Sequence, residues 1–421
     1  MAEKQGFSIL KYKLYNVEDV KKAASEKRFT VISCFAGGGG SSTGYKLAGG
    51  NILLINEFVE EAIASYKQNY PETPVLVDDI KKYSGEDFLK MANIKPGELD
   101  ILDGSPPCSA FSVAGKREKG WVGYEQDTRR SKLDFDSEDG VAHEGELVVK
   151  EGIKTYSDGK VVEGIEDLFL EFIRVAKDIK PKVIVAENVK GITFGEAKGK
   201  LYEFINNFES LGYLVTYKVL NAADFGTPQA RERTIFICVR NDVAEKIGLS
   251  FLDVNSIFPN PTYRKHISLK EAIHDVINDP EQEKELYDYV QNGFQKKWIE
   301  MLPFNPERHT KPSDKQYRDV NPKASLFNMI RPAPHLPCPT ITQRGNQKSV
   351  SGVFHYEKNR KFTIPELRRI MSLPEDYKLT GNFDKQAERI GRMVAPRMME
   401  AVANSIYENV LKPYYEVTEN E

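Results

Sequence analysis

Apolar runs separated by turn-forming residues dominate the first half of the chain. They are rich in β-branched residues and lie at 29–35, 51–58, 75–80, 99–104 and 182–188. Because such continuous runs are typical of strands covered on both faces, they predict parallel strands of a central sheet.

Between these runs, apolar residues recur with a helical period. The segments 60–70, 165–180 and 200–213 predict helices, and Gly212 provides a stop signal for the third. The second helix has a single apolar stripe, formed by Leu168, Phe172, Val175 and Ile179. This alternation of strands and helices predicts a doubly wound α/β domain.

Two further strands are expected at 213–221 and 233–240, joined by a short connection. So short a connection predicts an antiparallel pair that closes an otherwise parallel sheet. Beyond them the periodicity is poor, and Pro, Asn and aromatic residues are frequent. We therefore expect a catalytic α/β domain at 1–245, a loop-rich module at 246–356 and a closing part of the first domain at 357–421, ending in a helix.

A charged insertion interrupts the first domain. The stretch 115–132 is basic, and it leads into a strongly acidic stretch within an insertion at about 133–164. Such blocks are typical of solvated loops. Residues 145–164 predict a hairpin that turns at Asp158 and Gly159.

Composition narrows the class of protein. The chain has 421 residues, 40% of them hydrophobic, which is enough for two domains. It contains no apolar stretch of about 20 residues and no signal-like start, so we expect a cytoplasmic protein without a membrane span. The net charge of −3 gives no global basic field. The four cysteines and six histidines lack metal-ligand spacing, so neither a disulfide framework nor a metal site is expected.

Candidate chemistry gathers where the predicted strands end. A glycine-rich turn follows the first strand, Glu57 ends the second and Asp79 ends the third. In this architecture such a turn lets a ligand approach the backbone, and a carboxylate can accept hydrogen bonds from ribose hydroxyls. The pattern indicates an adenosine-bearing cofactor; a tight structural turn beside surface carboxylates is the alternative.

A second group of reactive residues follows later strands. Cys108 comes after two prolines, which hold its loop rigid. Glu187 follows the apolar run "VIVA" and is either an acid at the sheet edge or a residue at a helix start. Arg231 and Arg233 alternate before a strand and so point to one face. They suit recognition of a base edge or a phosphate, unless they are solvated edge charges.

Taken in order, these motifs carry a resemblance. "FAGGGG", "NEF", "DDI", "GSPPCSAFS", "AENVKG" and "QARER" resemble motifs of the DNA (cytosine-5) methyltransferases. "RKFTIPELRRIMSLPEDY" and "RIGRMVAPRMMEAVANSI" are similar to the family's last two blocks. The resemblance implies a Rossmann-like methyltransferase fold with a mostly parallel seven-stranded sheet and an antiparallel last strand. It also implies that the module at 246–356 is a target-recognition domain.

The resemblance further implies a mechanism. The Cys108 thiolate would add to carbon 6 of a cytosine flipped out of duplex DNA. Glu187 would hold and protonate ring N3, Arg233 would bind the ring oxygen O2, and Arg231 would support the same wall. The activated carbon 5 would then take the methyl group of S-adenosyl-L-methionine, without a metal.

Further contacts follow from the same resemblance. The expected cofactor-binding residues are Phe35, Gly37, Gly39, Glu57, Phe58, Asp79, Ile80, Pro107, Leu168 and Val394. The expected DNA-binding residues are Ser112, Lys116, Arg117 and Thr340. Arg392 stands where the family has an asparagine that contacts the cofactor, and this departure puts that contact in doubt.

The function expected from the sequence is methylation of cytosine at carbon 5 in a specific duplex DNA sequence. It would protect the DNA from a cognate restriction endonuclease, although an orphan or regulatory methylase is equally compatible with the residues. The enzyme is expected to be a monomer. Two alternatives remain at this point: a transfer RNA cytosine-5 methyltransferase of the same superfamily, and an inactive DNA-binding regulator on the same fold. The intact Cys108, Glu187 and Arg233 disfavour the regulator.

Overall fold

The structure is a computed structural model. It describes residues 12–106, 154–155, 161–162, 165–263, 265–292, 295–313, 315–316, 319, 329–343 and 352–420. Among the residues with an expected role, Pro107, Cys108, Ser112, Lys116 and Arg117 lie outside these ranges.

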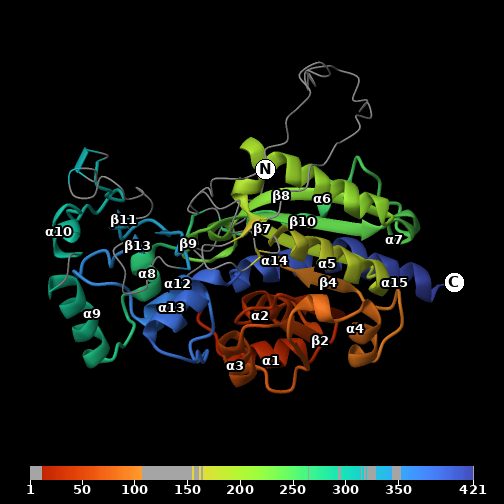
Figure 1. Ribbon diagram of the computed structural model, residues 1–421, viewed down its shortest axis with the longest axis horizontal. Helices are drawn as coiled ribbons and strands as arrows, with labels where there is room; N and C mark the ends of the chain where they lie inside the picture. Colours follow the sequence, from red (N-terminus) through yellow and green to blue (C-terminus); the bar gives the residue numbers. More distant parts are fainter. Residues whose placement is uncertain are drawn as a thin grey trace, which may run out of the picture.

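A seven-stranded sheet forms the centre of the molecule, with the strand order β3-β2-β1-β4-β7-β10-β8 (Figure 1). Its strands are β1 (Phe29–Cys34), β2 (Gly50–Glu57), β3 (Val75–Val77), β4 (Ile101–Gly104), β7 (Val183–Val189), β8 (Tyr213–Asn221) and β10 (Glu232–Arg240). The pairs from β3 to β7 are parallel, whereas β10 is antiparallel to both β7 and β8. The predicted α/β sheet is confirmed, and its last strand is inserted between β7 and β8.

Helices cover both faces of this sheet. One face packs against α1 (Val17–Ala24), α2 (Gly40–Leu47), α3 (Glu60–Asn69) and α14 (Pro396–Ile406). The other packs against α4 (Gly85–Ala92), α5 (Ile165–Ile179) and α6 (Lys198–Ser210). Successive residues of β1 supply the two cores, because side chains alternate between the faces of a strand: Val31 belongs to the first and Ile32 to the second.

The loop-rich module contains more helix than the sequence indicates. It holds α8 (Leu269–Ile273), α9 (Pro280–Asn292), α10 (Gln295–Glu300) and the short strands β11 (Met329–Ile330) and β13 (Gly352–Val353). Helix α9 was not predicted, because only Leu286 and Val290 are buried along it and so narrow a stripe gives little periodicity. In Figure 1 this module lies at the opposite end of the molecule from α15 (Lys412–Glu419).

The closing part of the chain returns to the first domain. Strand β12 (Cys338–Pro339) pairs in parallel with β9 (Gln229–Ala230). Helices α12 (Ile364–Ile370) and α13 (Phe383–Arg392) follow, and α14 packs against α2. The predicted C-terminal helix is confirmed, with a π-helical segment, Tyr407–Leu411, between α14 and α15.

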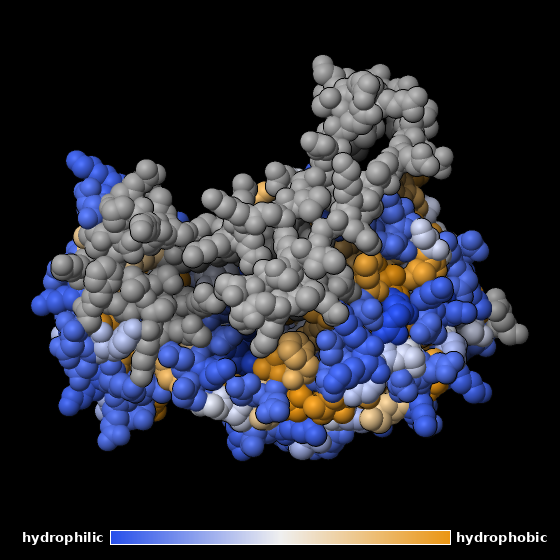
Figure 2. Space-filling view, in the orientation of Figure 1, coloured by the Kyte–Doolittle hydropathy of each residue, from blue (hydrophilic) through white to orange (hydrophobic). Residues whose placement is uncertain are grey.

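Short elements complete the described fold. The strands β5 (Lys154–Thr155) and β6 (Val161–Val162) pair antiparallel, as the hairpin prediction requires, while Asp158 and Gly159 lie outside the described residues. The remaining elements are α7 (Asn241–Lys246), η1 (Ile80–Lys82), η2 (Lys190–Thr193), η3 (Gly195–Ala197), η4 (Ala222–Phe225) and η5 (Val254–Ile257). In the described parts of the chain no helix is long and apolar enough to cross a bilayer. The coloured surface in Figure 2 is mostly hydrophilic, with small apolar patches.

Candidate active site

The glycine-rich turn lies between β1 and α2, at the carboxyl end of β1. Gly37 and Gly39 have positive φ angles of 57° and 90°, which residues with a side chain rarely adopt. A Cβ atom on Gly39 would lie 2.6 Å from Oη of Tyr377, so the turn has no room for one. The same Tyr377 hydroxyl donates a hydrogen bond to the carbonyl of Gly38. The turn is therefore held in one shape by a residue of the closing segment.

Glu57 fixes the other side of this turn. Its Oε2 accepts a hydrogen bond from the Gly37 amide at 2.7 Å, and its Oε1 accepts from the amides of Phe58 and Val59 at 2.9 Å. The residue is 6% exposed, whereas Phe58 is 57% exposed. Of the four lone pairs of the carboxylate, these amides use three, so Oε2 can still accept a hydrogen bond from the ribose.

The remaining described cofactor candidates lie around the same edge of the sheet. Strand β3 ends at Val77, so Asp79 lies two residues beyond it, where it accepts a hydrogen bond from the Lys81 amide at 3.0 Å. Ile80 and Val394 are buried, and Leu168 packs partly buried on the second core. A side-chain-free turn, two carboxylates and apolar walls suit a nucleoside with hydroxyl groups and an exocyclic amine.

Glu187 and Arg233 form an ion pair. The Arg233 Nε lies 2.8 Å from the Glu187 Oε1, and the two side chains are only 14% and 11% exposed. Neighbouring strands bring them together, because β10 runs antiparallel to β7 in this region. Burial lowers the pKa of Arg233, and the Glu187 carboxylate acts in the opposite direction. The Glu187 carboxylate and the Arg233 guanidinium thus lie side by side and are largely shielded from solvent.

Arg231 faces the protein's own backbone. It is 2% exposed, and its Nη1 and Nη2 donate to the carbonyls of Ile341 at 2.9 Å and Gly391 at 3.0 Å. Burial lowers its pKa well below the usual range, and the nearby positive charge of Arg233 adds to this effect. Arg231 therefore ties the closing segments to the base of β10, and its contacts are those of a supporting residue.

The chain around Arg231 is joined to β12 and the residues that follow it. Thr340 donates from Oγ1 to the Ala230 carbonyl at 2.8 Å, and the Gln229 Oε1 accepts from the Ile341 amide at 3.2 Å. Gln229 is fully buried. The threonine expected to contact DNA thus lies beside the arginines, with its hydroxyl already bonded to backbone.

Arg392 is the last residue of α13. Its Nε and Nη2 contact Oε1 of Glu388, one helical turn earlier, at 2.9 and 2.7 Å. The side chain is 52% exposed. Arg392 therefore forms a surface ion pair at the position where the family has an asparagine.

Asp103 is a site residue that the sequence reasoning missed. It ends the apolar part of β4 and accepts hydrogen bonds from Ser33 Oγ at 2.7 Å, Ser41 Oγ at 3.1 Å and Tyr45 Oη at 3.1 Å. Burial raises its pKa to about 6. The carboxyl group thus links β1, α2 and β4 beside the glycine-rich turn. An acidic residue inside an apolar run was the available signal.

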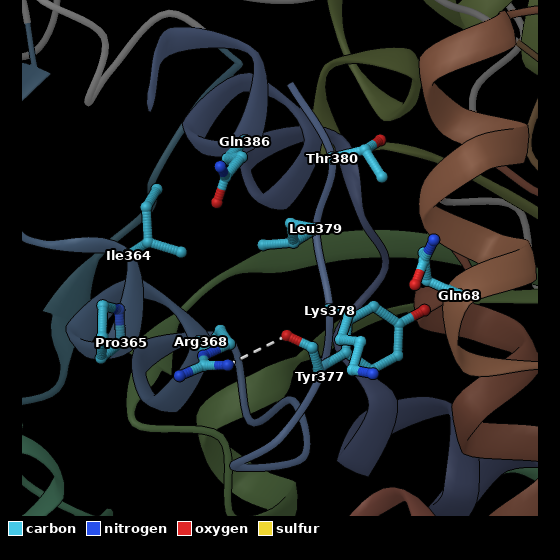
Figure 3. A pocket seen from close by; sticks show the side chains of 9 residues that line it. All are labelled: Gln68, Ile364, Pro365, Arg368, Tyr377, Lys378, Leu379, Thr380 and Gln386. Carbon is cyan, nitrogen blue, oxygen red and sulfur yellow. Dashed lines mark hydrogen bonds between the residues drawn. The ribbon is translucent and has the colours of Figure 1, made fainter. Parts of the chain in front are cut away.

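A surface hollow of about 370 Å³ lies behind Tyr377 (Figure 3). It is lined by Gln68, Ile364, Pro365, Arg368, Tyr377, Lys378, Leu379, Thr380 and Gln386, and Arg368 Nη1 donates to the Tyr377 carbonyl at 3.0 Å. None of the expected site residues lines it. The candidate chemistry therefore lies at the sheet edge, not in this hollow.

The fold and the site define a class: an α/β enzyme with a nucleoside-binding edge and an acid–arginine pair beside it. Comparison with known proteins makes the class specific. The sequence model of the C-5 cytosine-specific DNA methylases matches residues 29–136 and 156–408. The chain belongs to the C-5 cytosine-specific DNA methylase family. The match leaves out 137–155, inside the insertion expected at about 133–164.

Two relatives of known name are similar in sequence to this chain along most of their length. The Type II methyltransferase M1.HphI of Haemophilus parahaemolyticus is 30% identical over 394 residues, covering 90% of this chain and 86% of the relative. The Type II methyltransferase M.DdeI of Desulfomicrobium norvegicum is 27% identical, with 90% and 89% covered. This chain is therefore an S-adenosyl-L-methionine-dependent DNA (cytosine-5) methyltransferase that acts on double-stranded DNA.

Solved structures share the fold. A prophage-encoded protein of E. coli, assigned as a DNA modification methyltransferase, has a TM-score of 0.59 at 19% identity and covers 91% of this chain and 99% of its own. The Dnmt2 methyltransferase of S. pombe has a TM-score of 0.53 at 15% identity, with 91% and 98% covered. At these identities the likeness concerns the fold alone.

Proposed function

We propose that Cys108, Glu187 and Arg233 are the residues that methylate cytosine. The observation that supports this is the Glu187–Arg233 ion pair of 2.8 Å beside the end of β4. Strands β4 and β7 are neighbours, with Gly104 opposite Ala186. Glu187 follows Ala186 directly, and Cys108 comes four residues after Gly104. Adjacent strands thus lead to the acid and to the nucleophile.

The proposed chemistry follows from these groups. The Cys108 thiolate adds to carbon 6 of the ring, and the negative charge that develops is stabilised at N3 by the proton of Glu187. Arg233 orients the Glu187 carboxyl and reaches the ring oxygen O2. When bound, S-adenosyl-L-methionine supplies an electrophilic methyl group for carbon 5. Removal of the carbon 5 proton then restores the ring double bond and expels the Cys108 thiolate.

The proposed cofactor contacts are those expected from the sequence. Glu57 accepts from the ribose hydroxyls, Asp79 accepts from the adenine amine, and Phe58 offers its exposed ring to the base. The turn at Gly37 and Gly39 brings the backbone close to the ligand. Phe35, Ile80, Pro107, Leu168 and Val394 complete the proposed walls.

DNA recognition is proposed for the module at 246–356. The target base must leave the stack, at a cost of about a few kcal/mol, and the major groove supplies the sequence information. Ser112, Lys116 and Arg117 are proposed to contact the DNA backbone. Thr340 is proposed to contact DNA close to the flipped base, because its backbone partner Ala230 directly precedes Arg231.

The biological role is proposed from the relatives. M1.HphI and M.DdeI are Type II methyltransferases. We therefore propose that this enzyme, acting as a cytoplasmic monomer, protects DNA from a restriction endonuclease with the same recognition sequence. DNA methylated by the enzyme would then resist that endonuclease, and cleavage of fully methylated DNA would contradict this role.

Replacement of the nucleophile tests the proposed mechanism. We expect Cys108→Ser to abolish methyl transfer from tritiated S-adenosyl-L-methionine to DNA, because a hydroxyl is a far weaker nucleophile than a thiolate. Cofactor and DNA binding should remain near the wild-type values in equilibrium titrations. Turnover by this variant within tenfold of the wild type would contradict the proposal.

A further inference from the structure

Arg389 is a buried arginine on α13 that no part of the mechanism uses. Its side chain lies against the glycine-rich turn: Cγ and Cδ are 2.7 and 2.9 Å from the place where a Cβ atom on Gly38 would be. The residue is 7% exposed, and its Nε has no hydrogen-bond partner. Within the described parts of the chain, its guanidinium forms no ion pair. The buried Nε thus lacks the hydrogen bond that burial calls for, which indicates a partner that binds beside it.

The carboxylates near Arg389 already have other donors. Among the charged groups, Glu57 acts most strongly on the pKa of Arg389, followed by the cation Arg392 with the opposite sign and then by Glu388 and Glu61. Glu57 accepts from three backbone amides, Glu388 pairs with Arg392, and Glu61 lies 3.2 Å from the Lys385 Nζ. These three carboxylates therefore attract the positive charge of Arg389, but none of them forms an ion pair with it.

The turn below Arg389 is itself favourable for an anion. Helix α2 has eight residues and begins at Gly40, two residues after Gly38. Amide groups at a helix N-terminus and the helix dipole favour a negative charge. The cofactor has one carboxylate, at its amino-acid end, and this end must lie away from the ribose that Glu57 is proposed to hold.

We propose that Arg389 binds the carboxylate of S-adenosyl-L-methionine, together with the N-terminal amides of α2. The proposal rests on the cofactor contacts proposed above and adds the group that recognises the amino-acid end. It makes Arg389 a specificity residue, which distinguishes the complete cofactor from analogues that lack the carboxylate. The opposing hypothesis is that Arg389 serves only as a counter-charge for Glu57.

Calorimetric titration of the full-length protein, without DNA, separates the two hypotheses. The ligands are S-adenosyl-L-methionine and decarboxylated S-adenosylmethionine, which differ only in the carboxylate. The wild type should bind the decarboxylated ligand about 10- to 100-fold more weakly, as expected for charge-assisted hydrogen bonds. Arg389→Met should weaken binding of the complete cofactor by a similar factor and change binding of the decarboxylated ligand less than about threefold.

Two further variants complete the design. Lys385→Met removes an exposed cation from the same helix and should leave both affinities unchanged. Arg389→Lys keeps a positive charge and should retain part of the preference for the ligand with the carboxylate. If Arg389→Met does not fold, this variant still tests the proposal. Equal weakening of both ligands by Arg389→Met, or equal binding of both by the wild type, would overturn the proposal. Absence of any cofactor binding by the wild type would overturn the cofactor site as well.

Discussion

The site residues of this enzyme fall into two groups. Some are proposed to contact the substrate, and others bind neighbouring parts of the protein and so support the site. Arg231 and Arg233 are two positions apart, yet one donates to the carbonyls of Ile341 and Gly391 while the other pairs with Glu187. Asp103 belongs to the second group, because three hydroxyl groups converge on its buried carboxyl. Because burial raises the pKa of Asp103, this residue makes the free energy of unfolding depend on pH.

The pH dependence caused by Asp103 has a definite sign. Its pKa is about 6 in the folded protein and 3.8 ordinarily, so the folded state retains this proton over the interval where the unfolded chain has lost it. Stability from this group is complete below about pH 4 and is lost as the pH rises through about 6. About two pKa units correspond to about 3 kcal/mol.

Urea unfolding of the wild type and Asp103→Asn at pH 4 and pH 7 tests this expectation. The free energy of unfolding of the wild type, relative to the variant, should fall by about 3 kcal/mol between the two values. Contributions of other groups cancel in the difference. A difference that is the same at both pH values would contradict a raised pKa for Asp103.

At the scale of elements, the closing segment shapes the cofactor edge. Tyr377 lies more than 300 residues from Gly38 in sequence, yet it bonds to that carbonyl and fills the space beside Gly39. Arg389 of α13 and Met393, the C-cap residue of that helix, occupy the place beside Gly38. The glycine-rich turn therefore depends on contacts with residues that follow the loop-rich module at 246–356 in the sequence.

Gly39→Ala tests this dependence. A side chain at φ 90° is strained, and the new Cβ would also clash with the Tyr377 hydroxyl. We expect a loss of about 2–4 kcal/mol in the free energy of unfolding, measured in urea. The control is Gly212→Ala, which has φ 84° but no atom within 4 Å, and should lose only about 1–2 kcal/mol. Equal losses for the two variants would show that contact with Tyr377 contributes nothing.

The seven strands of the central sheet and the helices α3, α5, α6 and α14 could be predicted, because each carries its own apolar pattern. The apolar patterns of β1 and β2 also predict where these strands end, and the glycine-rich turn and Glu57 lie at those ends as expected. The role of Arg231 could not be predicted, since its partners lie 110 and 160 residues away and are backbone carbonyls. Arg389 was also missed, because the packing of α13 against Gly38 leaves no trace in either segment alone.

At the scale of the whole molecule, a buried ionic network joins the loop-rich module at 246–356 to the closing part of the chain. Arg360 is 1% exposed and donates to both oxygens of Glu366 at 2.8 Å, and it also contacts Glu283 of α9. Asn278 donates to the same Glu366 at 3.0 Å. Since Glu366 belongs to α12, these bonds fix the position of α9 on the catalytic domain.

Arg360→Met should break this connection. It leaves Glu366 buried without its cation, and we expect a loss of about 3–5 kcal/mol in the free energy of unfolding. The double variant Arg360→Met/Glu366→Gln should recover much of this loss, because the buried charge is gone. Lys358→Met, the control, removes an exposed cation from the same Glu283 and should cost less than about 1 kcal/mol. If Arg360→Met also costs less than about 1 kcal/mol, the buried ion pair with Glu366 does not have the proposed stabilising role.

The central claim is that this chain methylates cytosine at carbon 5 within one DNA sequence, through Cys108. Its most direct test is bisulfite sequencing of DNA from a bacterial host without cytosine methylation that expresses either the wild type or Cys108→Ser. The account predicts protected cytosines at one position of a single short sequence with the wild type, and none with the variant. No protected cytosines with the wild type, or the same pattern with Cys108→Ser, would contradict it.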